Sequence, residues 1–220
     1  MPSSIRPTGE YKVDFMANIN GVYRLVDTAT TKDKLRALPG VLLQVNADPE
    51  EGTTYTDDTM TISFLPGHII LKDGYITIQL PPELRFTEKA ECVSFGLGFS
   101  PETKCEFVKQ TGLLTIKKAF TLSSYTTLDL PVEIKVSGIF TPRSVKPTTN
   151  FRLETFDKNG WLIDTHETYF LPALRAAKDI EVVRAIQADN VVGRVTTYDL
   201  LLSSPYPLYI GDMLTITVPD

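Results

Sequence analysis

The sequence has few of the residues on which enzymes most often depend. Only two histidines occur among the 220 residues, His68 and His166, and neither belongs to a His-Glu-x-x-His metal motif. Gly96, Gly98 and Ser100 do not form the Gly-x-Ser-x-Gly turn of a serine hydrolase, and no helical pattern follows them to bind phosphate. Because no acid, base and nucleophile converge in the sequence, we predict no catalytic residues and no enzyme.

Long apolar runs and positive charge are also scarce. No apolar run approaches the roughly 20 residues that a membrane-spanning helix needs. The 27 acidic residues outnumber the 22 basic ones, which gives a formal net charge of −5. This balance argues against nucleic acid or anionic lipid as a partner. No Asn-X-Ser/Thr sequon occurs, so we expect no N-glycans, while O-linked sugars stay open.

Cysteine is limited to Cys92 and Cys105. Their separation of thirteen positions could close a local disulfide loop between adjacent strands, worth about 3 kcal/mol in the chain-entropy model. The alternative is a pair of reduced, partly buried thiols. The sequence contains no Cys-x-x-Cys and no histidine near either cysteine, which argues against zinc and against thioredoxin-type chemistry.

Strict alternation of apolar and polar residues dominates the rest of the chain. Such alternation is typical of half-buried β-strands. Its apolar positions fall in five runs: Met60, Ile62 and Phe64; Ile76, Ile78 and Leu80; Leu114 and Ile116; Val132, Ile134 and Val136; and Phe151 and Leu153. Tight hairpin turns are expected at residues 72–74, 110–112 and 158–160, where each segment ends in glycine. We therefore predict an all-β fold, an antiparallel β-sandwich of the immunoglobulin-like type.

The chain also repeats itself. Residues 5–28 match residues 145–165, including Asn20-Gly21 against Asn159-Gly160. Residues 59–82 match residues 197–220 without a gap. The offsets of 140, 137 and 138 positions indicate tandem units of roughly 138 residues.

The phase of the repeat divides the chain into three parts. We predict that residues 1–30 are the C-terminal end of a preceding repeat, 38–168 a complete β-sandwich, and 178–220 the N-terminal part of the following repeat. One complete unit would thus be flanked by two partial units. The favoured interpretation is a piece cut from a longer tandem array. The alternative is a natural subunit whose incomplete ends pair with neighbouring copies of itself by β-strand addition.

The connection between units carries the only helical pattern. A short helix is expected within residues 171–187, through Leu174, Ala177 and Lys178, with a counterpart at residues 32–40. We place the first strand of each unit directly after it. These first strands are expected at Val41–Val45 and at Ile180–Val183.

A family resemblance rests on the order of these signals. The strand at residues 76–82 ends in two prolines, the cysteine loop follows, and a Leu-Thr-Ile strand lies at residues 114–116. Next come Val136-Ser137-Gly138-Ile139 and the segment 142–148, closing on Phe156-Asp157 and Ile163-Asp164. This order resembles a repeat of very large cell-surface proteins of ciliates and other protists, over about residues 55–165. The resemblance implies an extracellular structural or adhesive array without catalysis.

Two groups of residues could bind ligands. Acidic side chains near the start of the full unit could hold calcium between neighbouring sandwiches. These candidates are Asp48, Glu50, Asp57 and Asp58, with Glu51 beside them. Solvated loop carboxylates are the alternative. Trp161 and Tyr169 could form a sugar-binding surface, but a lone tryptophan after an Asn-Gly turn more often packs at the edge of the core, and Val22 at the matched position favours packing.

Three classes of function follow from this pattern. The first is a rigid, non-catalytic spacer in an extracellular coat, ciliary or flagellar filament or adhesin stalk, with neighbouring repeats or further copies as partners. The second is a module that binds carbohydrate or protein through loops 83–104 or 119–130. An enzyme is the third and has the least support in the residues.

Overall fold

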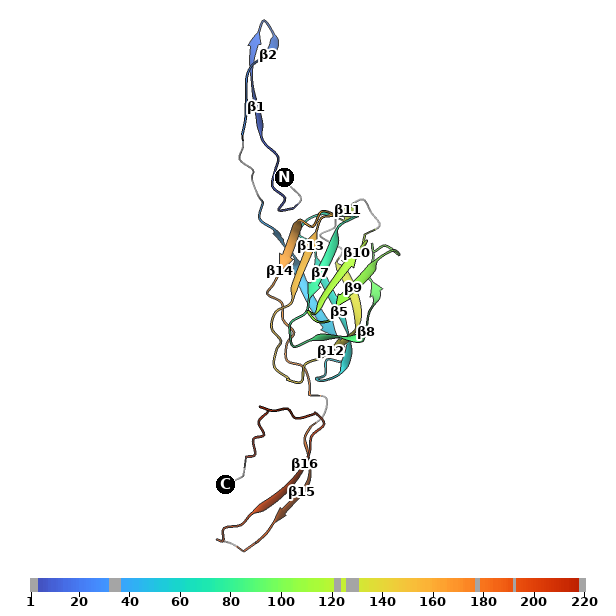
Figure 1. Ribbon diagram of the computed structural model, residues 1–220, viewed down its shortest axis with the longest axis vertical. Coiled ribbons are helices and arrows are strands. Elements are labelled where there is room, and N and C mark those ends of the chain that lie inside the picture. The colour runs from blue at the N-terminus through green and yellow to red at the C-terminus, as the bar shows by residue number, and fades with distance from the viewer. Residues whose placement is uncertain are drawn as a thin grey trace.

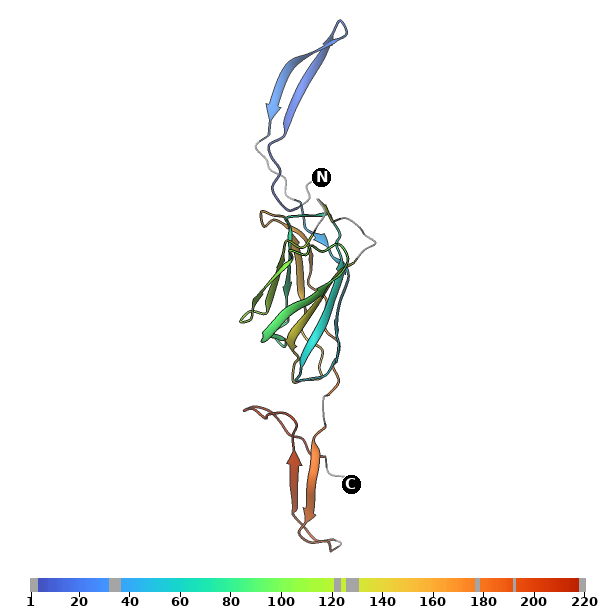
Figure 2. The same ribbon diagram turned by 90° about the vertical axis from the view of Figure 1, so that its right-hand side faces the viewer.

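The computed structural model describes residues 4–31, 37–120, 124–125, 131–176, 179–191 and 193–217, and within them every regular element is a β-strand. A two-layered sandwich occupies the middle of the chain. A hairpin projects from each of its two ends, one formed near the N-terminus and one near the C-terminus (Figures 1 and 2).

One layer of the sandwich is a six-stranded sheet. Its strands, in spatial order, are β3 (Gly40–Val41), β14 (Leu162–His166), β13 (Arg152–Phe156), β7 (Tyr75–Gln79), β10 (Leu113–Lys117) and β9 (Lys104–Val108). All neighbours run antiparallel except β3, which pairs with β14 in parallel.

The other layer is a four-stranded antiparallel sheet. It contains β4 (Leu43–Pro49), β5 (Asp57–Leu65), β12 (Val132–Phe140) and β8 (Arg85–Phe95), in that order. A small separate pair joins β6 (Ile70–Leu71) to β11 (Ser124–Tyr125).

The core lies between the two layers, where the alternating residues place it. The fully buried side chains include Met60, Ile62, Phe64, Ile76, Ile78, Leu114, Ile116, Val132, Ile134, Val136, Phe151 and Leu153. The predicted alternation is therefore confirmed at each of these positions. Burial of each large aliphatic or aromatic side chain contributes about 1.5–3 kcal/mol.

A bulge in the central strand β12 depends on Gly138. The register of β12 shifts between Val136 and Ile139 against β5, and Gly138 adopts a φ of 72°. A Cβ atom at this position would lie 2.7 Å from the Ala90 Cα and N atoms. Only glycine combines this backbone conformation with so close an approach of the neighbouring strand.

The protruding elements are two hairpins. β1 (Lys12–Ile19) pairs with β2 (Val22–Thr30), and β15 (Glu181–Gln187) pairs with β16 (Tyr198–Ser203). Each forms its own two-stranded sheet, and no described residue extends either sheet.

The helix expected within residues 171–187 is wrong for the residues that the structure describes. Leu171 and Leu174 lie buried in an extended segment, Arg175 bridges to Thr53, and β15 begins at Glu181. Long-range pairing outweighs the local helical preference of this segment. Ala177, Lys178 and much of the counterpart at 32–40 lie outside the described residues.

The loop expected over residues 83–104 is also wrong in part. Half of it is β8, an eleven-residue strand that forms one edge of the four-stranded sheet. The side chains of β8 alternate weakly in burial because an edge strand exposes much of both faces. Of the second expected loop, most residues between 121 and 130 lie outside the described part of the chain.

Candidate functional site

The two strands of the C-terminal hairpin pair in the same register as two neighbouring strands inside the sandwich. β15 and β16 pair as β4 and β5 do, with every position shifted by 138 residues. The matched pairs are Leu43–Leu65 with Glu181–Ser203, Asn46–Ser63 with Arg184–Leu201, Ala47–Ile62 with Ala185–Leu200, Asp48–Thr61 with Ile186–Asp199, and Pro49–Met60 with Gln187–Tyr198. Both pairs have a register shift within their first four residues.

The N-terminal hairpin reproduces a second internal pair, that of β13 and β14. The matched pairs are Val13–Ala29 with Leu153–His166, Asp14–Thr28 with Glu154–Thr165, Phe15–Asp27 with Thr155–Asp164, and Met16–Leu25 with Phe156–Leu162. The register shifts coincide too, at Phe15/Met16 and at Thr155/Phe156. The turn glycines, Gly21 and Gly160, have φ values of 81° and 82°.

The matched residues differ in burial. Leu153 is 1% exposed, whereas its counterpart Val13 is 61% exposed. Met60 is 0% exposed, whereas Tyr198 is 58% exposed. The hairpins therefore carry the apolar pattern of core strands without the layers that cover those strands.

A cluster of aromatic and charged residues fixes the C-terminal segment to the end of the sandwich. We call Tyr55, Arg143, Tyr206, Tyr209 and Asp212 the junction cluster. The Arg143 guanidinium donates to the Pro207 carbonyl oxygen at 2.7 Å and to Asp212 Oδ2 at 2.6 Å, and it lies 4.4 Å from the centre of the Tyr209 ring. The Tyr206 ring meets that of Tyr55 edge-on at 5.7 Å.

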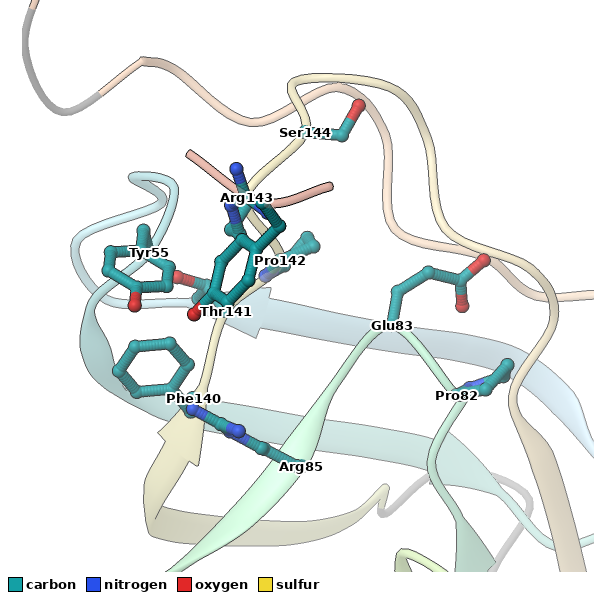
Figure 3. A pocket seen from close by; sticks show the side chains of 10 residues that line it. Tyr55, Pro82, Glu83, Arg85, Phe140, Thr141, Pro142, Arg143 and Ser144 are labelled. Atoms are coloured by element: carbon teal, nitrogen blue, oxygen red, sulfur yellow. The ribbon is translucent and has the colours of Figure 1, made fainter. Parts of the chain in front are cut away.

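A cleft of about 430 Å³ lies beside the junction cluster. Figure 3 shows the Tyr55 ring next to that of Phe140, with Arg85 reaching along the Phe140 ring and Arg143 above Tyr55. The Arg85 guanidinium carbon lies 4.6 Å from the centre of the Phe140 ring. Glu83, Pro82 and Ser144 are among the other residues that line it. The lining thus combines aromatic rings with two cations and one carboxylate.

Two groups of the junction cluster have shifted pKa values. The hydrogen bond with Tyr209, followed by burial, raises the pKa of Tyr55. The backbone N–H of Tyr209 and then the Arg143 guanidinium lower the pKa of Asp212. The negative form of Asp212 is thus the one that the cluster stabilises.

The C-terminal segment is expected to loosen from the sandwich in acid. Because the folded pKa of Asp212 lies below the ordinary value of about 3.9, its contribution is complete above that pH. The contribution is lost as the pH falls through the folded value. NMR of the Tyr209 amide should therefore show a transition below about pH 4. Asp212→Asn should abolish this transition, and a transition that persists in this variant would mean that another group causes it.

At the opposite end of the sandwich, hydrogen bonds hold the N-terminal segment. The Ile5 N–H donates to the Leu162 carbonyl oxygen at 2.9 Å, and the Ser4 hydroxyl donates to Asp157 Oδ2 at 3.4 Å. The Asp157 carboxylate also accepts the N–H groups of Asn159 and Trp161 in the turn between β13 and β14. The segment that precedes the first hairpin therefore contacts the turn between β13 and β14. The turn of that hairpin, Asn20-Gly21, has the same sequence as this one, Asn159-Gly160.

Cys92 and Cys105 form a disulfide with a Cα–Cα distance of 6.4 Å. The predicted disulfide is therefore confirmed, and the alternative of two reduced thiols is wrong. Cys92 belongs to β8 at the edge of the four-stranded sheet, and Cys105 belongs to β9 at the edge of the six-stranded sheet. The bond therefore links the two layers along one open side of the sandwich.

The calcium candidates lie close together in sequence but engage different partners. The Asp58 carboxylate is buried and accepts the N–H groups of Glu51, Gly52 and Thr59 at 2.7–3.1 Å. Glu50 pairs with Lys135 at 3.4 Å, while Asp48 and Asp57 lie exposed in β4 and β5. Across the described ranges, no three His, Cys, Asp or Glu side chains gather in a way that could hold a metal ion. Calcium binding here stays a prediction.

Both histidines make contacts that involve strand β14. His68 Nδ1 lies 2.7 Å from Asp164 Oδ1, and the His68 N–H donates to the same carboxylate at 3.0 Å. His166 Nδ1 lies 3.2 Å from the Leu42 carbonyl oxygen. Asp164 is fully buried, and the two contacts from His68 provide its carboxylate with hydrogen-bond partners.

Tyr169 packs on the core rather than facing a ligand. Its ring meets Phe151 edge-on at 5.9 Å, and its hydroxyl donates to the Ala47 carbonyl oxygen at 3.1 Å. Trp161 is 38% exposed in the turn before β14. The structure therefore supports the packing interpretation for Tyr169.

Sequence reasoning missed the junction cluster. Arg143 and Tyr209 lie far apart in the chain, and although Arg143 falls in the segment 142–148 of the family resemblance, no pattern in the sequence links it to Tyr209. The only local signal is the pair Tyr206 and Tyr209 in a proline-containing segment that shows no alternation.

Comparison with known proteins gives distant structural likeness only. No family model and no curated protein sequence matches the chain. The major pilin subunit BcpA* of Bacillus cereus shares 12% identity, with a TM-score of 0.40 over 88% of this chain and 60% of its own. An immunoglobulin-like protein of Nocardia farcinica shares 14% identity, with a TM-score of 0.36 over 54% of this chain and 80% of its own.

A third structure, the C-terminal domain of the antigen I/II-family protein AspA of Streptococcus pyogenes, shares 11% identity and has a TM-score of 0.37. It covers 75% of this chain and 55% of its own. With TM-scores of this size, the comparisons carry no argument about this chain. The class that the fold defines is an all-β, immunoglobulin-like sandwich with two protruding hairpins. Among the described residues, no helix has the length and hydropathy to cross a membrane.

Proposed function

We propose that this chain is part of a tandem array of immunoglobulin-like sandwiches that acts as a rigid, non-catalytic spacer in an extracellular surface or appendage protein. The observation that carries the proposal is the agreement of strand register, including the register shifts, between each protruding hairpin and an internal strand pair. Unrelated hairpins have no physical reason to share both register and irregularities. Partial units at both ends of a complete one account for this agreement.

Two further features favour a mechanical role outside the cell. The Cys92–Cys105 disulfide is typical of oxidising compartments. The junction cluster fixes the next segment to the sandwich by an ion pair, aromatic contacts and a cation–π contact, which would restrict bending between units. The resemblance of the sequence to repeats of large protist surface proteins belongs to the same proposal.

Immuno-electron microscopy of intact cells tests this function. Antibodies against the sandwich should label the surface of unpermeabilised cells at regular intervals along a filament or coat. Immunoblots should show a polypeptide much longer than 220 residues. Labelling that appears only after permeabilisation would contradict an extracellular role, and irregular single sites would contradict an array.

Recognition of a carbohydrate or protein is the second candidate. The cleft beside the junction cluster supports it, because aromatic rings with neighbouring cations can bind sugars or acidic groups. Its volume lies within the range of about 300–1,000 Å³ typical of small-molecule sites. We rank recognition second because the Arg143 guanidinium already makes a cation–π contact with the Tyr209 ring within the chain.

A further inference from the structure

We propose that Ser144 and Val145 bind the following unit of the array, at its turn between the counterparts of β13 and β14. This inference rests on the proposed function, because it needs consecutive units in one polypeptide. It adds the partner surface: a side-chain oxygen that accepts the Ser144 hydroxyl and a backbone carbonyl oxygen that accepts the Val145 N–H. Together with Arg143, these two residues complete a joint that holds two turns of the next unit.

The first step is a repeat within the chain. Residues 142–148 read Pro-Arg-Ser-Val-Lys-Pro-Thr, and residues 2–8 read Pro-Ser-Ser-Ile-Arg-Pro-Thr. The two donors therefore have counterparts in the earlier segment: Ser144 matches Ser4, and Val145 matches Ile5. Each serine oxygen also lies close to the backbone nitrogen two residues further on, at 3.5 Å in the first segment and 3.1 Å in the second. Both segments thus combine the same sequence with the same local contact.

The second step is the surface that the first of these segments contacts. The Ser4 hydroxyl donates to Asp157 Oδ2 at 3.4 Å. The Ile5 N–H donates to the Leu162 carbonyl oxygen at 2.9 Å. Both acceptors lie at the turn between β13 and β14. The serine is covered in this contact, since Ser4 is only 7% exposed.

The third step is that both copies of this turn have the same kind of acceptor. Asp157 Oδ1 accepts the N–H groups of Asn159 and Trp161 within the turn. In the turn of the first hairpin, Asn18 Oδ1 accepts the Gly21 N–H at 2.9 Å. A carboxylate or amide oxygen therefore caps the turn in both units. A following unit with the same turn offers the same acceptor, because the turn itself uses it.

The fourth step is that Ser144 and Val145 are uncovered where their counterparts are bound. Ser144 is exposed, and Val145 is 47% exposed. No described residue accepts a backbone hydrogen bond from the Val145 N–H. Figure 3 shows Ser144 beyond Arg143, with its hydroxyl directed away from the rings of the cleft. The structure thus leaves both donors open to a partner.

The place of that partner follows from the turn that Arg143 holds. Residues 209–212 match residues 71–74, and in both the fourth N–H donates to the first carbonyl oxygen, at 3.0 and 2.8 Å. In the sandwich, the turn at 71–74 leads into Tyr75, which lies opposite Phe156 at the end of β13. The turn between β13 and β14 therefore lies beside it. In the following unit, the equivalent turn lies beside residues 209–212, within reach of the residue after Arg143.

Two contacts from adjacent residues fix the angle between units. A single contact allows rotation about itself, whereas Arg143 and Ser144 hold two separate turns with no flexible residue between them. The preceding joint lacks the arginine contact in its sequence: Ser3, Leu71 and Gly74 stand where Arg143, Tyr209 and Asp212 would be. The serine contact needs only groups that are present at both joints, so we assign it the general role.

Hydrogen exchange of the native polypeptide tests the contact at Val145. Peptides that contain Val145 should exchange roughly tenfold slower in the native polypeptide than in the 220-residue protein, because the N–H is bound only in the former. Peptides that contain Ile5 should be protected in both proteins and provide the reference. Equal exchange at Val145 in the two proteins would overturn the proposal.

Matched variants of the 220-residue protein test the chemistry of the contact. Ser4→Asp places a carboxylate against that of Asp157, so exchange at Ile5 should become roughly tenfold faster. Ser4→Ala removes only the hydroxyl and should give a smaller change in the same direction. Ser144→Asp is the control, because no described residue faces it as Asp157 faces Ser4, and exchange at Val145 should not change. Full protection of Ile5 in both Ser4 variants would overturn the transfer of this contact to Ser144.

The two proposals fail separately. If native material shows a periodic surface array but Val145 exchanges as fast as in the 220-residue protein, this contact is wrong and the array stands. If Val145 is protected in the native polypeptide but antibodies label only permeabilised cells, the contact between units stands and the extracellular spacer function is wrong.

Discussion

Replacement of Phe151 by alanine is expected to lower the free energy of unfolding of the sandwich by about 3–5 kcal/mol. Phe151 is 0% exposed, and its N–H donates to the Tyr169 carbonyl oxygen at 2.7 Å. Its ring fills the space between the two layers and contacts the Tyr169 ring. Alanine would leave a cavity between the two layers. The surrounding strands cannot move in to close it, because sheet hydrogen bonds hold them in place. Chemical denaturation followed by the fluorescence of the single tryptophan, Trp161, measures the loss.

Tyr11→Ala is the matched control. Tyr11 precedes β1 as Phe151 precedes β13, but it is 44% exposed. Its replacement should change the free energy of unfolding by less than about 0.5 kcal/mol. An equal loss in both variants would mean that the N-terminal hairpin belongs to the cooperative core, contrary to its exposure.

Removal of the disulfide has the second large expected effect. The double replacement Cys92→Ala with Cys105→Ala should cost about 3 kcal/mol of folding free energy, because the unfolded chain regains the entropy of an open loop. Loss of the bond also frees β8 and β9, two edge strands in different layers, to separate. Denaturant midpoints of the double variant and the oxidised wild type give the difference.

Reduction of the wild type provides an independent comparison for this experiment. The reduced protein should match the double variant within about 1 kcal/mol, since both lack the same constraint. A double variant as stable as the oxidised wild type would show that the sheet contacts alone hold this side closed.

The alternation of residues predicted most of the core. Ile76, Ile78, Ile134 and Val136 were assigned to the buried face by period alone, and all are fully buried. The reason is that a strand places successive side chains on opposite faces, so burial follows directly from spacing. The turns at Gly112 and Gly160 could be predicted for a similar local reason, because few other residues adopt a positive φ without strain.

Features that depend on distant partners could not be predicted in this way. The segment at residues 171–176 has a helical pattern, yet Arg175 pairs with the Gly52–Thr53 backbone and the chain stays extended. The junction cluster contains Tyr55, Arg143 and Tyr209, which come from three segments far apart in the sequence. Their proximity depends on how the fold brings these segments together at one end of the sandwich. Neither propensity nor periodicity includes such information.

By itself, then, the sequence determined the strand pattern, the buried positions and the self-similarity at about 138 residues, because each depends on neighbours along the chain. Only the tertiary structure decided which strands share a sheet and that the disulfide links the two layers. It also decided that core-like strands stand uncovered at both ends. The physical reason is that layer assignment and exposure depend on contacts between residues far apart in sequence, whose free energy no local pattern records.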